Sequence, residues 1–239
     1  MTNSLYHIRT ISAVRVSLLV CAILVGGALP AVAGEAENAQ QLVDKAKLTL
    51  DAFVADKDMG PSLKALLKKA RGVLIYPQVL RGAFVFGVSG GSGTFVAYDA
   101  TAKKWGGPAF YTIGETSFGA QAGADASEVV LVALTERGMT VLLATSAKLG
   151  ADVGIAVGPV GAGAEAATAN LSADIISLSR AKGLYAGVSL EGAVVATRGA
   201  LNKAYYGKEV SPTDILVKRT VSNQKAAGLV SAVSKAAGK

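Results

Sequence analysis

Apolar residues between positions 34 and 71 recur at three- and four-residue steps, the spacing of one face of an α-helix. In the first stretch these positions are Ala39, Leu42, Val43, Ala46, Leu50 and Phe53. The pattern breaks at 58–61, Asp-Met-Gly-Pro, because glycine and proline interrupt helical continuity. We therefore expect an N-terminal helix within 34–60 and a shorter helix from about Ser62 to Ala70.

From Gly72 to Gly199 the apolar residues come instead in short runs bounded by turn residues, which is typical of β-strands. The expected strands are Val73–Tyr76, Ala83–Val88, Thr94–Tyr98, Ala109–Ile113, Val129–Leu134, Ile175–Ser179 and Leu184–Leu190. A further helix is expected over Gly138–Ala147. Frequent glycine permits the bends and close approaches that a strongly curved sheet requires. The pattern predicts an α+β fold: a curved antiparallel sheet or barrel-like sandwich, with N-terminal and C-terminal helices packed against it.

The glycine-rich stretch Gly87–Gly93 follows an expected strand, and such loops can cradle phosphate with backbone N–H groups. A nucleotide-hydrolase phosphate loop would continue with Gly-Lys-Ser/Thr, but Thr94-Phe95-Val96 follows here. A dinucleotide fold would need a helix next, where we expect a strand. A tight hairpin between two strands is the preferred interpretation.

Positive charge gathers at the C-terminal side of the chain. Residues 201–239 carry seven basic and two acidic side chains, and the whole chain has a formal net charge of +7. Lys218, Arg219, Lys225, Lys235 and Lys239 accompany Leu229, Val230 and Val233 on an expected amphipathic helix. This basic tail, 211–239, could dock on the sheet, lie on an anionic surface or fray.

Residues 1–33 have the layout of a cleaved secretory signal peptide. A basic start is followed by the 14-residue apolar run Val16–Leu29 and by Ala31-Val32-Ala33. As a helix that run would reach about 21 Å, which is short for a membrane span of about 30 Å. We expect cleavage after Ala33 and a periplasmic or secreted protein. The alternative is retention as a membrane anchor.

The only His and the only Cys, His7 and Cys21, lie in that N-terminal segment. The expected mature chain therefore has no disulfide, no thiolate nucleophile, no Cys/His zinc site and no imidazole base. A composition of 51% hydrophobic and 17% charged residues argues against a disordered chain. We expect neither a cofactor nor a metal.

Acidic residues of the sheet region offer little support for catalysis. They are scattered and mostly border turns, so no carboxylate pair for glycoside hydrolysis can be chosen from spacing. These acids are Asp99, Glu115, Asp125, Glu128, Asp152, Glu165, Asp174 and Glu191. Single-stranded nucleic-acid binding is not expected either, because the aromatics sit in apolar strand runs away from the basic clusters.

The helix Ser62–Arg71 is the stronger candidate site. Its leucines share one face and its basic residues lie beside them, an arrangement that can rest at a membrane interface. The alternative, favoured by composition alone, is that the leucines pack on the sheet and the lysines face water. Trp105 follows Lys103-Lys104 at an expected turn, where it could anchor at an interface or pack beneath a loop.

Several stretches resemble the SYLF domain, a lipid-binding module of exported bacterial proteins and of eukaryotic endocytic and actin-patch proteins. They are 69–75, Gly90-Gly91-Ser92-Gly93, 104–108, Leu149-Gly150, 156–161, 179–192 and Tyr205-Tyr206-Gly207. The resemblance runs from about Pro61 to Gly207, most of the expected mature chain, and places a SYLF-like domain at 61–210. The chain departs from the family pattern at Leu178, often tyrosine, and at Gly106, often serine.

The resemblance implies a non-enzymatic domain that binds phosphoinositides or other anionic lipid head groups. It implies lipid contact by basic residues before the first strand, which carries over to Lys69 and Arg71; Lys64 and Lys68 join them from their place on the helix. Trp105 is a further candidate anchor. The alternative is a protein-interaction module with an actin-like or cell-envelope partner. We expect a peripherally membrane-associated protein.

Overall fold

The computed structural model describes residues 29–83, 86–118, 123–158, 173–181, 184–185 and 190–239. The helices are α2 (Leu29–Ala55), α3 (Gly60–Lys69), α4 (Glu136–Leu143), α6 (Gly199–Tyr206), α7 (Pro212–Leu216) and α8 (Ala227–Ala237), with a 3-10 turn at Gln224–Ala226. The strands are β1 (Gly72–Ala83), β2 (Phe86–Asp99), β3 (Lys104–Phe118), β4 (Gly123–Ala133), β5 (Ser146–Lys148), β6 (Ile155–Val157), β7 (Ile175–Ala181), β8 (Leu184–Tyr185) and β9 (Val194–Thr197).

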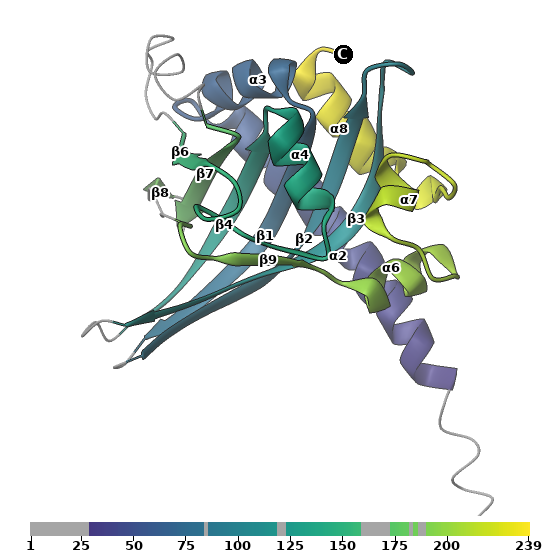
Figure 1. The fold of residues 1–239 in the computed structure, drawn as a ribbon, viewed down its shortest axis with the longest axis horizontal. Helices are drawn as coiled ribbons and strands as arrows, with labels where there is room; N and C mark the ends of the chain where they lie inside the picture. Colours follow the sequence, from purple (N-terminus) through teal and green to yellow (C-terminus); the bar gives the residue numbers. More distant parts are fainter. Residues whose placement is uncertain (1–28, 84–85, 119–122, 159–172, 182–183, 186–189) are drawn as a thin grey trace, which may run out of the picture.

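One curled sheet organises the molecule, in the order β5-β9-β3-β2-β1-β4-β7-β6, with β8 paired to β7 (Figure 1). Every pairing is antiparallel except that between β6 and β7, which is parallel. The predicted α+β class, with a curved sheet and helices from both ends of the chain against it, is confirmed.

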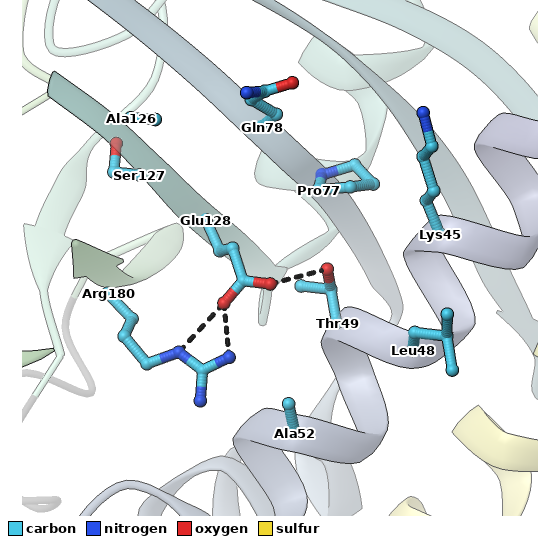
Figure 2. Close-up of a pocket in the computed structure, with 10 residues that line it drawn as sticks. All are labelled: Lys45, Leu48, Thr49, Ala52, Pro77, Gln78, Ala126, Ser127, Glu128 and Arg180. Carbon is cyan, nitrogen blue, oxygen red and sulfur yellow. Dashed lines mark hydrogen bonds and ion pairs between the residues drawn. The ribbon is translucent and has the colours of Figure 1, made fainter. Parts of the chain in front are cut away.

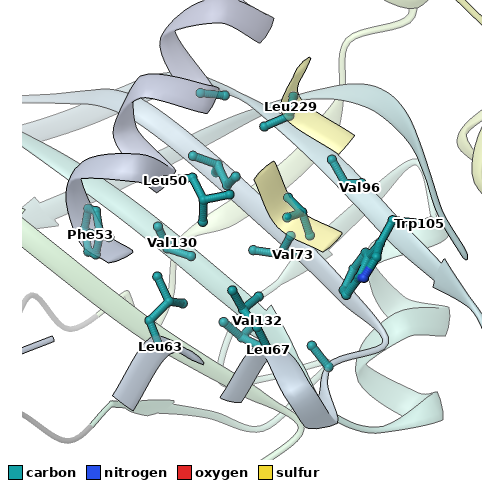
Figure 3. Packing of buried hydrophobic residues seen from close by; sticks show 14 of the residues in the cluster. Leu50, Phe53, Leu63, Leu67, Val73, Val96, Trp105, Val130, Val132 and Leu229 are labelled. Atoms are coloured by element: carbon teal, nitrogen blue, oxygen red, sulfur yellow. The ribbon is translucent and has the colours of Figure 1, made fainter. Parts of the chain in front are cut away.

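Alternation along the strands divides the core into two layers. Val73, Ile75 and Val130 face the side of the sheet that α2, α3, α6 and α8 cover (Figure 3). Leu74 and Leu131 face the other side, where α4 and α7 pack. Both faces of the central strands are therefore buried, which explains their continuous apolar runs.

The N-terminal helices form where the apolar spacing predicted them. Ala39, Val43, Ala46, Leu50 and Phe53 are all buried along α2. That helix already begins at Leu29, and residues 1–28 lie outside the described part of the chain, so signal-peptide cleavage stays a prediction. No helix in the described ranges has both the length and the hydropathy to cross a bilayer.

The predicted glycine hairpin at Gly87–Gly93 is wrong. These residues lie within β2, which pairs with β1 on one side and β3 on the other. The register with β1 shifts between Ile75 and Gln78, which marks a β-bulge in β1 opposite this part of β2. Glycine serves close strand approach here, because a Cβ on Gly91 would lie 2.4 Å from the Gln78 carbonyl oxygen.

Two other strand predictions changed in extent. Ala83–Val88 spans the end of β1 and the start of β2, and residues 84–85 between them are outside the described residues. Of Leu184–Leu190, only Leu184–Tyr185 is strand, and 186–189 is likewise outside them. The helix predicted at Gly138–Ala147 is α4, which begins earlier because the Thr135 side chain accepts a hydrogen bond from Gly138 N–H as its N-cap. It also ends earlier, at Leu143, and Ser146 and Ala147 belong to β5.

Candidate functional site

Helix α3 places its leucines and its lysines on opposite sides. Leu63, Leu66 and Leu67 are at most 2% exposed in the core between α3, α8 and the sheet, whereas Lys64, Lys68 and Lys69 are exposed. Of the two alternatives for this helix, packing on the sheet is therefore the one observed. The leucine face is unavailable as a membrane anchor in this fold.

Helix α3, which carries Lys64, Lys68 and Lys69, lies at the same end of the molecule as the β2–β3 turn and the last turn of α8 (Figure 1). The ammonium group of Lys239 joins these elements, because it donates to the Lys68 carbonyl oxygen at 3.1 Å and to the Ala70 carbonyl oxygen at 3.0 Å. It also lies 4.0 Å from the centroid of the Tyr98 ring. We call this surface the basic end; its lysines are Lys64, Lys68, Lys69, Lys103, Lys104, Lys235 and Lys239.

The basic end carries almost no compensating acid. None of its seven lysines forms an ion pair with another described residue. Burial lowers the pKa of Lys239, and the positive charge of Arg71 acts in the same direction. Such a concentration of like charge is typical of a surface that meets an anionic partner.

Arg71 differs from the lysines because its guanidinium pairs with Glu136 on α4. Its backbone N–H donates to the Ala133 carbonyl oxygen at 2.9 Å, at the join between α3 and β1. Part of its charge is therefore compensated within the fold. Of the four predicted basic residues, three present free charge and the fourth links α3 to α4.

Trp105 is 4% exposed and packs beneath α8 at the start of β3, with its ring 5.4 Å from that of Tyr98 (Figure 3). Of the two alternatives given for this residue, the structure shows packing, beneath α8 rather than beneath a loop. Its neighbours Lys103 and Lys104 remain exposed at the turn.

The β2–β3 turn is stabilised by hydrogen bonds and an ion pair that involve Asp99 and Arg219. The Asp99 carboxylate accepts hydrogen bonds from Thr101 N–H and Ala102 N–H at 2.9 Å each, and it lies 3.5 Å from the Arg219 guanidinium. The hydrogen bond from Ala102 is the main reason that the pKa of Asp99 is lowered. Arg219 also donates to the Lys104 carbonyl oxygen at 3.1 Å. The turn that carries Lys103 and Lys104 is therefore preorganised.

The departure at Gly106 lies beside the same arginine. A Cβ at this position would lie 3.1 Å from the guanidinium carbon of Arg219, so a larger residue here would require a small shift of that side chain. Leu178, the other departure, is fully buried on the α2 side of the sheet.

A hollow lies between α2 and the sheet, away from the basic end, with a volume of about 610 Å³ (Figure 2). Its centre is an ion pair in which Arg180 Nε donates to Glu128 Oε2 at 2.8 Å. Thr49 Oγ1 donates to the other carboxylate oxygen at 3.1 Å, and the guanidinium lies 5.3 Å from the Phe53 ring centroid. The central Arg180–Glu128 pair is internally compensated and Lys45 is the other cation among the described residues that line this hollow, so its positive charge is far smaller than that of the basic end.

Other predicted acids of the sheet region also serve structure. Glu115 pairs with Arg81, Asp174 accepts from Thr135, and Asp152 accepts from Lys148 N–H. Among the described residues, no group of three His, Cys, Asp or Glu side chains is arranged to hold a metal ion. Glu165 lies outside the described residues.

Comparison with known proteins identifies the family. A family model described as "Ysc84: Las17-binding protein actin regulator" matches residues 114–236. The chain belongs to the Ysc84 family. The SYLF resemblance is thereby confirmed.

Related proteins include longer, multi-domain chains. An SH3 domain-containing protein of Schizosaccharomyces pombe is 36% identical over 168 residues, 68% of this chain and 37% of the relative. Protein YSC84 of Saccharomyces cerevisiae is 32% identical over 174 residues, 70% of this chain and 36% of the relative. The human SH3 domain-containing YSC84-like protein 1 is 31% identical over 153 residues, 63% of this chain and 44% of the relative. This Ysc84-family chain thus spans less than half of each of these relatives.

Sequence reasoning missed how the lysines combine. Lys103 and Lys104 were considered only as neighbours of Trp105, and Lys235 and Lys239 only as part of a basic tail. The excess of basic residues over 201–239 was the available signal. That excess does not predict that α8 packs against α3, and this packing brings distant segments of the Ysc84-family fold together.

Proposed function

We propose that this chain is a non-enzymatic, actin-related protein-interaction domain that docks an acidic surface of its partner through the basic end. Membership of a family described as actin regulators supports the class of function. Relatives named LAS seventeen-binding protein 3 also point to protein partners. The observation that carries the proposal is the set of seven lysines without a paired acid. Complementary potentials steer association and select partners.

Actin-filament co-sedimentation tests this function with the full chain. We expect a variant carrying Lys64→Glu, Lys68→Glu and Lys69→Glu to bind filaments at least about tenfold more weakly, because like charges across an interface are costly. The substitutions should spare the fold, since all three side chains are exposed.

The matched control replaces Lys45, Lys148 and Lys208 with glutamate, which changes net charge equally at exposed positions elsewhere. It should bind as the parent chain does. An equal loss of filament binding in both variants would show that net charge, and not the position of the lysines on α3, determines binding. Absence of filament binding by the parent chain would overturn the actin-related assignment.

A second candidate function is reversible binding to anionic membranes, favoured by the exposure of Lys64, Lys68 and Lys69 on one helix. Each basic group near an anionic surface contributes about 1 kcal/mol, so several together can hold a protein. Because the leucines of α3 are buried, this binding would be electrostatic and without insertion of that helix. Export and peripheral membrane association belong to this proposal.

Vesicle co-sedimentation tests the membrane candidate. We expect binding to vesicles with about 30% anionic lipid at low salt, and its loss as ionic strength shortens the Debye length to about 8 Å. The α3 triple variant should bind more weakly than the control triple variant. Equal, salt-insensitive partitioning onto neutral vesicles would contradict this candidate.

A further inference from the structure

A groove separates α8 from the β2–β3 turn and the start of β3, with a volume of about 590 Å³. We call it the α8 groove. Lysines line it from both sides, Lys103 and Lys104 from the turn and Lys235 from the helix. The groove is also lined by the hydroxyl-bearing Ser231 and by the apolar side chains of Val230 and Trp105. No acidic residue of the described chain lines this groove.

The backbone of the β2–β3 turn, one wall of the groove, is held in place by contacts within the fold. Asp99 and Arg219 hold the turn that carries Lys103 and Lys104. Lys239 adds a further positive charge behind the wall, with its ammonium group 5.6 Å from the Trp105 ring centroid. A turn whose backbone is already ordered loses less conformational entropy on binding than a free one, which favours specific recognition.

Trp105 supplies an independent observation. The indole Nε1 is buried and has no hydrogen-bond acceptor among the described residues. A buried donor without a partner destabilises the folded state, so such groups are uncommon in folded proteins. The residue that carries this donor also lines the α8 groove.

We propose that the α8 groove is a recognition pocket for a carboxylate side chain within an acidic segment of a protein partner. This deepens the proposed function and rests on it. The ammonium groups of Lys104 and Lys235 pair with the carboxylate, and Val230 and the Trp105 ring contact its methylene groups. Trp105 Nε1–H gains an acceptor when the side chains that cover it move aside on binding.

The shape of the site favours a peptide segment over a membrane. The groove is a recess between a helix and a turn, which an extended chain with a protruding side chain can enter. A bilayer surface is a broad plane, which does not fit a narrow recess. The nearby leucines of α3, which could otherwise have inserted into a bilayer, are buried in the core. The groove also has an apolar wall, which a free inorganic anion would leave unused.

Trp105 is the only tryptophan of the chain, so its fluorescence reports on the groove without labelling. The full chain is titrated with a capped hexaglutamate peptide. We expect a saturable change in emission for the parent chain. Lys104→Glu combined with Lys235→Glu should raise the Kd at least tenfold, whereas the control Lys148→Glu with Lys208→Glu should change it less than twofold.

A second measurement keeps the proposal testable if emission is insensitive. Trp105→Phe keeps an aromatic ring but removes the N–H donor, and calorimetry should show a peptide Kd raised about threefold or more. In the parent chain, peptide should shift the indole N–H resonance in an NMR spectrum. Peptide binding unaffected by the groove substitutions would overturn the proposal.

Other probes separate the alternatives. Inorganic phosphate that matches the peptide in affinity would overturn peptide recognition in favour of a general anion site. Anionic vesicles that change Trp105 emission while the peptide does not would overturn it in favour of lipid. The α3 triple variant should keep its peptide affinity within twofold. If filaments fail to bind but the peptide binds through Lys104 and Lys235, the actin-related assignment fails and the pocket stands.

Discussion

Replacing Gly91 with alanine is expected to destabilise the fold by about 3 kcal/mol, because the added methyl group has no space. Its Cβ would lie 2.4 Å from the Gln78 carbonyl oxygen and 3.1 Å from the Val79 Cα. Both contacts are with backbone atoms of β1 at its bulge, so relief requires moving a central strand rather than rotating a side chain. Urea unfolding followed by circular dichroism measures the change.

The adjacent Gly90 provides a matched control in the same strand. The nearest atom to a Cβ there is the Ile113 carbonyl oxygen at 3.7 Å, an ordinary contact distance. Gly90→Ala should therefore change the free energy of unfolding by less than about 0.5 kcal/mol. Equal stability of the two variants would show that β2 does not approach the β1 bulge closely.

This glycine stretch shows where sequence reasoning failed. Seven residues rich in glycine and serine between apolar runs are typical of a hairpin loop, and nothing local distinguishes them from a strand. The decisive fact is the bulge between Ile75 and Gln78 on another strand. Close approach between β1 and β2 selects glycine at Gly91, and that is a property of the pairing rather than of the segment.

Patterns within a segment were more informative. The helical spacing of Ala39, Val43 and Ala46 correctly predicted the face of α2 that packs on the sheet. The alternation of apolar and polar residues is weak in β1 and β4, since both of their faces are buried, yet short apolar runs still located these strands. Hydrophobic periodicity predicts an element correctly where the same face of the segment is buried along its whole length.

The candidate site divides in the same way. The lysines of α3 could be predicted because a single helix presents them. The α8 groove could not, because its walls come from Lys103–Trp105 and from Ala227–Gly238, more than 100 residues apart in the chain. Two weak signals, a Lys-Lys-Trp turn and a basic tail, become one site only after α8 docks on the sheet.

Replacing Leu67 with alanine is expected to cost about 3 kcal/mol, because the side chain is fully buried and its removal leaves a cavity. For a domain of this size that corresponds to a fall in Tm of about 6–12 °C. The next residue, Lys68, is exposed, and Lys68→Ala should change stability by less than about 0.5 kcal/mol. Thermal unfolding of the two variants makes the comparison.

The same pair of variants separates a structural role of the leucines from a membrane role. Well below its Tm, Leu67→Ala should bind anionic vesicles as the parent chain does, because Leu67 faces the core and not the solvent. Lys68→Ala should weaken any such binding, since it removes an exposed charge. The opposite result would be a Leu67→Ala variant that keeps full stability and loses vesicle binding. In that case the leucine face of α3 would have to leave the core and enter the membrane, and the packed arrangement of this helix would not be the one that binds.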